Sequence, residues 1–331
     1  MTDYLSTAAI CETLAGPEAV RIEKQRLLPL ESGEIRVRLK AAALNFPDML
    51  MTYGKYQFKP ELPFILGMEG AGVIEETNGA SAPFKSGDKV LVKGKTGAFA
   101  EHITVRAAQL DPMPGHLSFE EAAAFAVTFL TAHVSLVERA KIKSGETLLV
   151  LGAGGGVGQA MVALGKALGA TVIAAASSAE KLAIARESGA DCLINYRCQD
   201  FRREVMNLTD GRGADVIVDP VGGTYFEDSL DCIAWAGRIL IVGFASGVFG
   251  VLKADILSRK GCSVLGVRAG EFGRRDPEAG RRAFADVCRL AEEKNLKPII
   301  HKCWPLDQVK EALQAMERRE IAGKQVVLIG K

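Results

Sequence analysis

The stretch Thr-Leu-Leu-Val-Leu-Gly-Ala-Gly-Gly-Gly-Val-Gly, residues 147–158, decides the fold of this chain. Its short apolar run ends at Gly152 and a helical pattern begins at Val157, which predicts a strand, a tight turn and a helix. Gly152, Gly155 and Gly158 follow a G-x-x-G-x-x-G spacing. In a dinucleotide-binding turn, the first glycine permits the turn, the second admits a pyrophosphate to the backbone, and the third lets the helix pack on the strand. The free N–H groups at the helix start attract that pyrophosphate.

The glycine spacing alone is weak evidence, because the usual fingerprint is G-x-G-x-x-G and such a turn can be purely structural. The pattern that follows strengthens it. We expect further strands at 171–176, 192–195, 216–219, 238–242 and 262–267, and helices at 159–168, 179–188, 201–208 and 224–234. Strands separated by helices of this length form right-handed crossovers and a doubly wound parallel sheet. The chain is therefore predicted to hold an α/β domain that binds a dinucleotide.

The bulk properties exclude several classes of protein. A chain of 331 residues is long enough for two domains. A net charge of +1 provides no basic field for nucleic acid. Charged residues and glycines interrupt the most apolar region, 148–176, and the N-terminus lacks the pattern of a signal peptide, so no membrane segment is predicted. Seven scattered cysteines without a C-x-x-C motif predict free thiols and a cytoplasmic location.

The regions before and after the predicted α/β domain have a different pattern of apolar and polar residues. Residues 33–44 alternate apolar and charged side chains, and together with 70–75 and 88–92 they predict a β-rich domain. Ser118 and Glu121 form a capping-box pattern that starts a helix through 125–139. The C-terminal part predicts helices at 279–293 and 306–318 and strands at 298–302 and 325–329. This tail is too small to hold a core of its own, so we expect it to fold back on the β-rich domain.

Short motifs occur along nearly the whole chain. They are Asn-Phe-Pro-Asp at 45–48, Pro-Phe-Ile-Leu-Gly-Met-Glu-Gly-Ala-Gly at 63–72, Gly-Ala-Phe-Ala-Glu at 97–101, Leu-Thr-Ala at 130–132, the glycine turn at 152–158, residues 177–181, Ile-Asn-Tyr at 194–196 and Gly-Lys at 323–324. In this order they resemble the medium-chain dehydrogenase/reductase superfamily. Within it, the chain is similar to the zinc-free quinone oxidoreductase branch, which includes zeta-crystallin.

The resemblance implies an α/β fold with two domains. A GroES-like, β-rich catalytic domain would comprise residues 1–126 and 268–331, and a Rossmann domain with a doubly wound parallel sheet would comprise 127–267. A cleft would hold the nicotinamide. In this family dimers form through the edge of the nucleotide domain. The apolar segments 238–243 and 262–267 are predicted to be edge or near-edge strands that need covering, so we expect a homodimer.

The same resemblance argues against a metal site. Zinc alcohol dehydrogenases of this superfamily carry a cysteine where Asn45 stands and Gly-His-Glu where this chain has Gly67-Met68-Glu69. Catalytic zinc requires three protein ligands in a fixed geometry, and the four histidines show no ligand spacing. We therefore predict a zinc-independent protein.

The cofactor is predicted to be NADPH. An NAD-binding sheet places an acidic residue at the end of its second strand, whereas this strand ends in Ser177 and Ser178. By resemblance, Ser177, Lys181 and Tyr196 line the pocket for the 2′-phosphate. The rest of the predicted cofactor set is Gly152, Gly154, Gly155, Gly156, Val157, Gly158, Ser178, Phe244 and Lys324.

Polar residues near the nicotinamide are inferred from the same resemblance. Asn45 and Thr131 would line the substrate pocket, and Tyr56 would border it; Tyr53 is a further polar candidate. Asn45 is expected to donate an amide N–H to a substrate carbonyl. The predicted function is NADPH-dependent reduction of quinones or of activated α,β-unsaturated carbonyls such as enals and enones. Two alternatives stay open: an enoyl-thioester reductase of the acryloyl- or crotonyl-CoA type, and an NADPH-binding protein with a crystallin-like or RNA-binding role.

Overall fold

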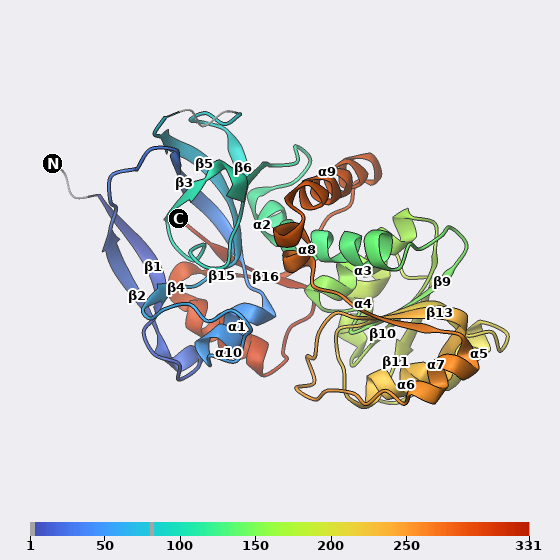
Figure 1. Cartoon of the computed structure of the whole chain (residues 1–331). Helices are drawn as coiled ribbons and strands as arrows, with labels where there is room; N and C mark the ends of the chain where they lie inside the picture. The colour runs from blue at the N-terminus through green and yellow to red at the C-terminus, as the bar shows by residue number, and fades with distance from the viewer. Residues whose placement is uncertain (1–3, 80–82, 331) are drawn as a thin grey trace. The chain divides into compact units, whose positions relative to one another are not determined.

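The computed structural model describes residues 4–79 and 83–330, which divide into two compact units (Figure 1). One unit comprises Met1–Val127 and Ile300–Lys331, and the other comprises Thr128–Ile299. The chain leaves the first unit once and returns to it near its C-terminal end. Both ends of the sequence therefore contribute to one unit.

The second unit contains a six-stranded, all-parallel sheet with strand order β11-β10-β9-β12-β13-β14. The strands are β9 (Thr147–Leu151), β10 (Thr171–Ala176), β11 (Cys192–Asn195), β12 (Ala214–Asp219), β13 (Ile233–Ile241) and β14 (Ser263–Gly266). The helices are α3 (Gly156–Ala167), α4 (Ala179–Glu187), α5 (Phe201–Leu208), α6 (Thr224–Cys232), α7 (Ala254–Lys260), α8 (Ala269–Arg275) and α9 (Pro277–Lys294). The predicted doubly wound sheet is confirmed, with β14 at one edge and β13 beside it.

The central strands of this sheet are apolar because helices cover both faces. All five residues of β9 are buried, as are five of the six in β10. A parallel strand buried on both faces reads as a continuous apolar run rather than an alternating one. This is the pattern that identified these strands in the sequence.

The first unit is built from antiparallel strands and the returning C-terminal segment. Its described residues form a seven-stranded sheet of order β15-β16-β3-β5-β6-β8, with β7 paired to β3, and a three-stranded sheet of order β2-β1-β4. The strands are β1 (Leu5–Cys11), β2 (Val20–Arg26), β3 (Glu34–Ala43), β4 (Phe64–Ile65), β5 (Glu69–Thr77), β6 (Lys89–Lys93), β7 (His102–Arg106), β8 (Leu110–Pro112), β15 (Ile300–Pro305) and β16 (Lys324–Leu328). Helices α1 (Phe46–Thr52) and α10 (Val309–Glu317) belong to the same unit.

The C-terminal strands join the N-terminal sheet directly. β16 pairs with β3 in antiparallel fashion, with Val327 opposite Ala42, so the red strands in Figure 1 complete the sheet begun by the blue one. The prediction that the tail folds back on the β-rich domain therefore holds for the segment from Ile300 onward.

Residues 268–299 differ from the predicted domain boundary, because they belong to the second unit. The apolar stripe of α9, which includes Phe284 and Val287, is buried. The His133 ring nitrogen lies 2.8 Å from Asp286 on α9, and the Gln159 side chain forms hydrogen bonds with the backbone of Ile299. These contacts hold α9 and the segment after it to the elements of the nucleotide domain.

The helix predicted through 125–139 consists of two parts. Helix α2 (Phe119–His133) starts with the predicted capping box, in which the Ser118 N–H donates to Glu121 and the Glu121 N–H donates to the Ser118 hydroxyl. A π-helical segment, Val134–Arg139, continues it. Among the described residues, Phe119–Arg139 is the one helix long and apolar enough to cross a membrane, and 67% of its apolar window is buried within the protein. Buried core helices meet the same criteria, so this is weak evidence for a membrane segment.

Gly158 on α3 provides a test of the helix–strand packing. A Cβ at this position would lie 2.3 Å from the Gly152 carbonyl oxygen, whereas a Cβ at Gly155 would meet its nearest atom at 3.5 Å. We expect Gly158→Ala to destabilise the protein by about 1–3 kcal/mol, the usual range for overpacking, and Gly155→Ala to have a much smaller effect. Urea denaturation of both variants measures the difference. Equal stability of the two would contradict this packing.

Candidate active site

The glycine turn of the second unit leaves a helix N-terminus without a side-chain cap. Gly152 adopts a φ of +61° directly after β9, and Gly155 is the N-cap of α3. No side chain caps this helix start. The N–H groups of a helix's first turn lack partners within the helix, so this turn, which contains the predicted residues Gly152 to Gly158, suits an anion.

Gly154 brings the start of α4 against this turn. A Cβ at Gly154 would lie 2.4 Å from the Cβ of Lys181 and 2.7 Å from its Cα. Only a residue without a side chain permits this approach, and Lys181 is thereby placed beside the turn. The glycine turn and Lys181, predicted separately from the sequence, are adjacent in the structure.

The carboxyl end of β10 carries hydroxyl groups instead of an acidic residue. Ser177 follows the strand, and Ser178 is the N-cap of α4, where its hydroxyl oxygen accepts a hydrogen bond from the Lys181 N–H at 3.3 Å. Glu180 is exposed on the first turn of α4. The end of β10 is therefore lined by small polar groups beside a lysine.

Two aromatic residues follow strands on opposite sides of β9 in the parallel sheet. Tyr196 follows β11, its N–H donates to the Ala176 carbonyl at 3.2 Å, and its ring packs on Tyr225 with centroids 4.7 Å apart. Phe244 follows β13 and contacts Phe249 edge to face, also at 4.7 Å. Both residues lie at the carboxyl end of the parallel strands, where open α/β sheets bind ligands.

Asn45 in the first unit lies in a buried polar cluster. It is the N-cap of α1, and its backbone N–H donates to the Asp48 carboxylate at 2.9 Å. Its side-chain amide donates to Glu69 at 2.9 Å and to the Ala43 carbonyl at 3.3 Å. Both N–H bonds of the amide are therefore directed to internal acceptors. The predicted donation from Asn45 to a substrate has no free N–H in this arrangement.

Lys324 provides the positive charge of this cluster. Its Nζ donates to the Leu44 carbonyl at 3.0 Å, and to the Asn45 side-chain oxygen and Glu69 at 2.9 Å each. The other oxygen of Glu69 accepts the Val127 N–H at 2.8 Å. All three donors of the lysine are satisfied internally. Lys324, predicted as a cofactor contact, thus holds Asn45 and Glu69 in place.

Asp48 is the member of the cluster whose charge is least compensated. It is completely buried, and its Oδ1 has no hydrogen-bond partner among the described residues. Burial, which outweighs the hydrogen bond from Asn45 and the attraction of Lys324, raises the pKa of Asp48 to about 7. Sequence reasoning missed Asp48 and Glu69 as site residues, although both lie within motifs that carried the family resemblance.

The remaining predicted site residues have different environments. Tyr56 is half-buried against the core of the first unit, and no described residue forms a hydrogen bond with its hydroxyl. The Tyr53 hydroxyl donates to Glu317 at 2.6 Å. Thr131 is half-buried on α2 in the second unit, and its carbonyl accepts the Ser135 hydroxyl at 2.6 Å, next to the π-helical segment. Tyr56 is thus the candidate with a hydroxyl available to a ligand.

The described residues of the first unit do not provide a donor set suited to zinc. Catalytic zinc prefers imidazole, thiolate or carboxylate ligands, whereas Asn45 offers an amide and Met68 a thioether. The Glu69 carboxylate is already bound by the Lys324 ammonium and the Val127 N–H. Within residues 4–79 and 83–330, no group of three or more histidine, cysteine, aspartate or glutamate side chains could hold a metal.

Two family models match the chain in the expected order. The alcohol dehydrogenase GroES-like domain matches residues 31–115, and the zinc-binding dehydrogenase model matches residues 156–286. The first match lies in the β-rich unit and the second in the unit with the parallel sheet. The GroES-like and Rossmann architecture is therefore supported by sequence families as well as by the fold.

Relatives and solved structures agree with these matches. The chain is 38% identical to a quinone oxidoreductase-like protein 2 homolog of Nematostella vectensis, over 97% of this chain and 88% of that one. It is 35% identical to a quinone oxidoreductase of Pseudomonas aeruginosa, over 95% and 96% of the two chains. A mycobacterial protein complexed with NADPH superposes with a TM-score of 0.88 at 29% identity, over 98% and 99%. The CurK enoyl reductase gives a TM-score of 0.88 at 25% identity, over 98% and 99%.

The raised pKa of Asp48 predicts a pH-dependent stability. Between the pKa of an unfolded aspartate, about 3.9, and the folded value of about 7, the folded protein holds a proton that the unfolded chain has lost. The free energy of unfolding should therefore fall by up to about 1.4 kcal/mol per pH unit in this window and level off above it. The Asp48→Asn variant has no ionisable group at this position, so its free energy of unfolding should fall less with rising pH. Urea denaturation of both proteins from pH 4.5 to 8 measures the two slopes, and parallel profiles would refute the assignment.

Proposed function

Because the chain belongs to the quinone oxidoreductase family of medium-chain dehydrogenases/reductases, we propose that it is a zinc-independent, NADPH-dependent reductase. Its proposed substrates are quinones and activated α,β-unsaturated carbonyls. The observation that carries the cofactor choice is the end of β10, where Ser177 and Ser178 stand in place of an acidic residue and Lys181 lies beside the glycine turn.

The two ends of the proposed cofactor site have distinct physical roles. The N-terminus of α3 offers N–H groups to the pyrophosphate, and the glycines keep side chains out of that space. At the other end, the Lys181 ammonium would attract a 2′-phosphate, and no carboxylate at the end of β10 would repel it. Bound NADPH supplies the hydride. The mycobacterial protein that superposes on this chain was solved with NADPH, which supports the choice.

The proposed role of the first unit is positioning and hydrogen bonding. The Tyr56 hydroxyl is free to donate to a substrate oxygen that gains negative charge. The cluster of Asn45, Glu69 and Lys324 fixes the start of α1, which precedes Tyr56 in the chain. Reduction of a quinone yields a hydroquinone anion with a phenol-like pKa, near 10, so water can supply its proton after hydride transfer. No dedicated general acid is required.

An enoyl-thioester reductase is the second candidate, favoured by the similarity to the CurK enoyl reductase. Both reactions transfer hydride to an electron-poor double bond, so the cofactor residues do not separate them. Turnover of NADPH with a quinone panel, an enal and crotonyl-CoA, measured in buffer containing EDTA, distinguishes the candidates. The proposal expects turnover with quinone or enal, undiminished by EDTA. Turnover with crotonyl-CoA alone would favour the second candidate.

We also propose that the protein is a cytoplasmic homodimer. β14 is an open edge of the parallel sheet. Several large apolar side chains of the same unit are strongly exposed; they are Trp235, Val248, Phe249 and Val251. Open strand edges and exposed apolar patches are commonly buried in protein–protein interfaces. In a dimer with a twofold axis, each copy buries this surface against the same surface of the other copy.

Cofactor preference tests the role of Lys181. NADPH should give a kcat/KM at least about tenfold higher than NADH, because a charge-assisted hydrogen bond contributes about 1.5–3 kcal/mol. Lys181→Ala should remove most of this difference, whereas Lys294→Ala, which removes a lysine from the last turn of α9, should preserve it. Steady-state kinetics with both cofactors measure the effect. Equal use of NADPH and NADH by the unmodified protein would disprove the cofactor assignment.

Tyr56→Phe tests whether the site relies on a hydrogen bond or on an essential acid. A single donor to a developing oxyanion contributes about 10²–10³-fold to kcat at most, so the variant should retain measurable activity and unchanged NADPH affinity. Asn45→Ala should also retain activity but lose stability, because it opens the cluster around Lys324. A million-fold loss of kcat in folded Tyr56→Phe would identify an essential proton donor and contradict this mechanism.

The oligomeric state tests the exposed apolar surface. We expect light scattering at micromolar concentration to give the mass of a dimer, and Trp235→Glu to shift it toward the monomer. Leu28→Glu is the matched control, since Leu28 is as exposed as Trp235 (71% against 74%) but lies in the other unit. A monomeric unmodified protein would rule out the dimer.

A further inference from the structure

Two β-bulges flank one polar patch on the large sheet of the first unit. Between β3 and β5 the register shifts twice, once between Arg36 and Val37 and once between Leu39 and Ala41. The first shift leaves Glu75 as an extra residue on β5, and the second leaves Lys40 as an extra residue on β3. Bulges redirect side chains and are enriched near functional sites. Here the two extra residues are both charged.

Gly72 fixes the backbone between the bulges. A Cβ at Gly72 would lie 2.3 Å from the Arg38 carbonyl oxygen, so the two strands approach too closely for any side chain there. Arg38 stands opposite Val73 on β5 and opposite His102 on β7. The backbone of Arg38 is thus paired with a strand on both sides.

Arg38 and Lys40 are cations without described partners. Both side chains line the same hollow, and no described residue forms a hydrogen bond or ion pair with either of them. By contrast, Arg36 on the same strand is paired with Glu76 at 2.7 Å. Two neighbouring like charges repel each other, and an anion placed between them would relieve that repulsion.

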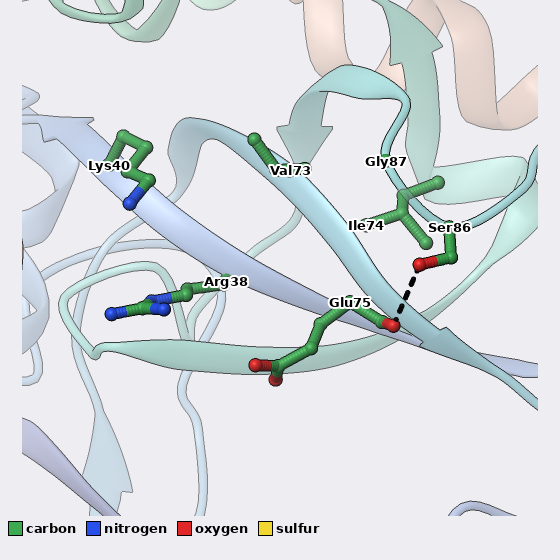
Figure 2. A pocket seen from close by; sticks show the side chains of 7 residues that line it. All are labelled: Arg38, Lys40, Val73, Ile74, Glu75, Ser86 and Gly87. Carbon is green, nitrogen blue, oxygen red and sulfur yellow. Dashed lines mark hydrogen bonds between the residues drawn. The ribbon is translucent and has the colours of Figure 1, made fainter.

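The two cations line a hollow of about 360 Å³ with Val73, Ile74, Glu75, Ser86 and Gly87 (Figure 2). Val73 provides apolar surface, whereas Ile74 is buried in the core, and the Ser86 hydroxyl donates to the Glu75 carbonyl at 3.0 Å. The Glu75 carboxylate is the one acidic group in the lining, and it lies 3.4 Å from the His102 ring. Glu101 is nearby, but its carboxylate accepts the Thr7 N–H at 2.7 Å. The lining therefore carries one net positive charge.

We propose that this hollow is a binding site for a small organic anion with a phosphate or carboxylate group. The guanidinium of Arg38 would bind two anion oxygens in its planar fork, and the Lys40 ammonium would add a point charge. The apolar surface of Val73 would contact the carbon part of the ligand. All of its lining residues belong to the β-rich unit.

The experiment is an NMR titration with inorganic phosphate and, separately, with succinate at constant ionic strength. The amide signals of Val73 and Gly87 report on the hollow, and those of Gly156 and Val157 report separately on the glycine turn. We expect at least one anion to shift the Val73 and Gly87 signals saturably, with a dissociation constant on the order of 1 mM, as two charge-assisted contacts would give. Binding of phosphate alone indicates a phosphorylated ligand, and binding of succinate alone indicates a carboxylate.

Three variants make the test specific. Arg38→Gln should weaken binding at least about tenfold, and Glu75→Gln should strengthen it because it removes the one negative charge of the lining. Lys24→Gln on β2 removes the same charge outside the hollow and should leave the affinity unchanged. Absence of saturable shifts at Val73 and Gly87, or equal affinity in the unmodified protein and Arg38→Gln, would overturn the proposal.

Discussion

The buried pairing of Lys324 with Glu69 organises the first unit. Bringing two opposite charges into a protein interior costs several kcal/mol per ion and is tolerated only when the remaining hydrogen bonds are complete. Here Lys324 uses all three donors, on Leu44, Asn45 and Glu69, and Glu69 also accepts the Val127 N–H. A partial network would leave an uncompensated buried charge, so the segments that carry Asn45, Glu69 and Lys324 must pack together. The C-terminal strand that carries Lys324 is therefore required to dock beside β3, and both ends of the sequence become parts of one unit.

The parallel sheet could be predicted from the sequence because its signal is local. Each central strand is a short apolar run that ends at a glycine, serine or proline, and each helix has its own start and stop residues. The domain boundary could not be placed in the same way. Residues 268–299 follow the last strand of the sheet and look like part of the tail, but the buried stripe of α9 and the contact between His133 and Asp286 tie them to the second unit. Residues 133 and 286 are far apart in the sequence, and a local pattern carries no information about such a pair.

The candidate residues of the two units were predictable to different extents. In the second unit, the glycine turn and Lys181 lie in one short stretch of the chain, and its glycines have structural roles that spacing already implies: Gly158 admits the Gly152 carbonyl and Gly154 admits Lys181. The buried cluster of the first unit depends on residues from three separate parts of the chain. Asn45 and Lys324 were recognised by resemblance alone, and their hydrogen-bonding partners, Glu69 above all, follow only from the packed structure. A motif indicates where in the fold a residue such as Asn45 lies. The groups to which its side chain donates hydrogen bonds depend on the residues packed around it.

This cluster also bears on which substrates the proposed reaction suits. The cation beside Asn45 and Glu69 is an ammonium whose donors are all used internally, so the groups left to a substrate oxygen are neutral hydrogen-bond donors such as the Tyr56 hydroxyl. Reduction of a simple ketone would produce an alkoxide at least as basic as hydroxide, and neutral donors stabilise such an anion poorly. A hydroquinone anion, whose conjugate acid has a pKa near 10, is less basic and needs less stabilisation from the site. The same holds for an enolate with delocalised charge. The hydrogen-bonding capacity of the site thus favours acceptors that spread the charge of the hydride over a conjugated system.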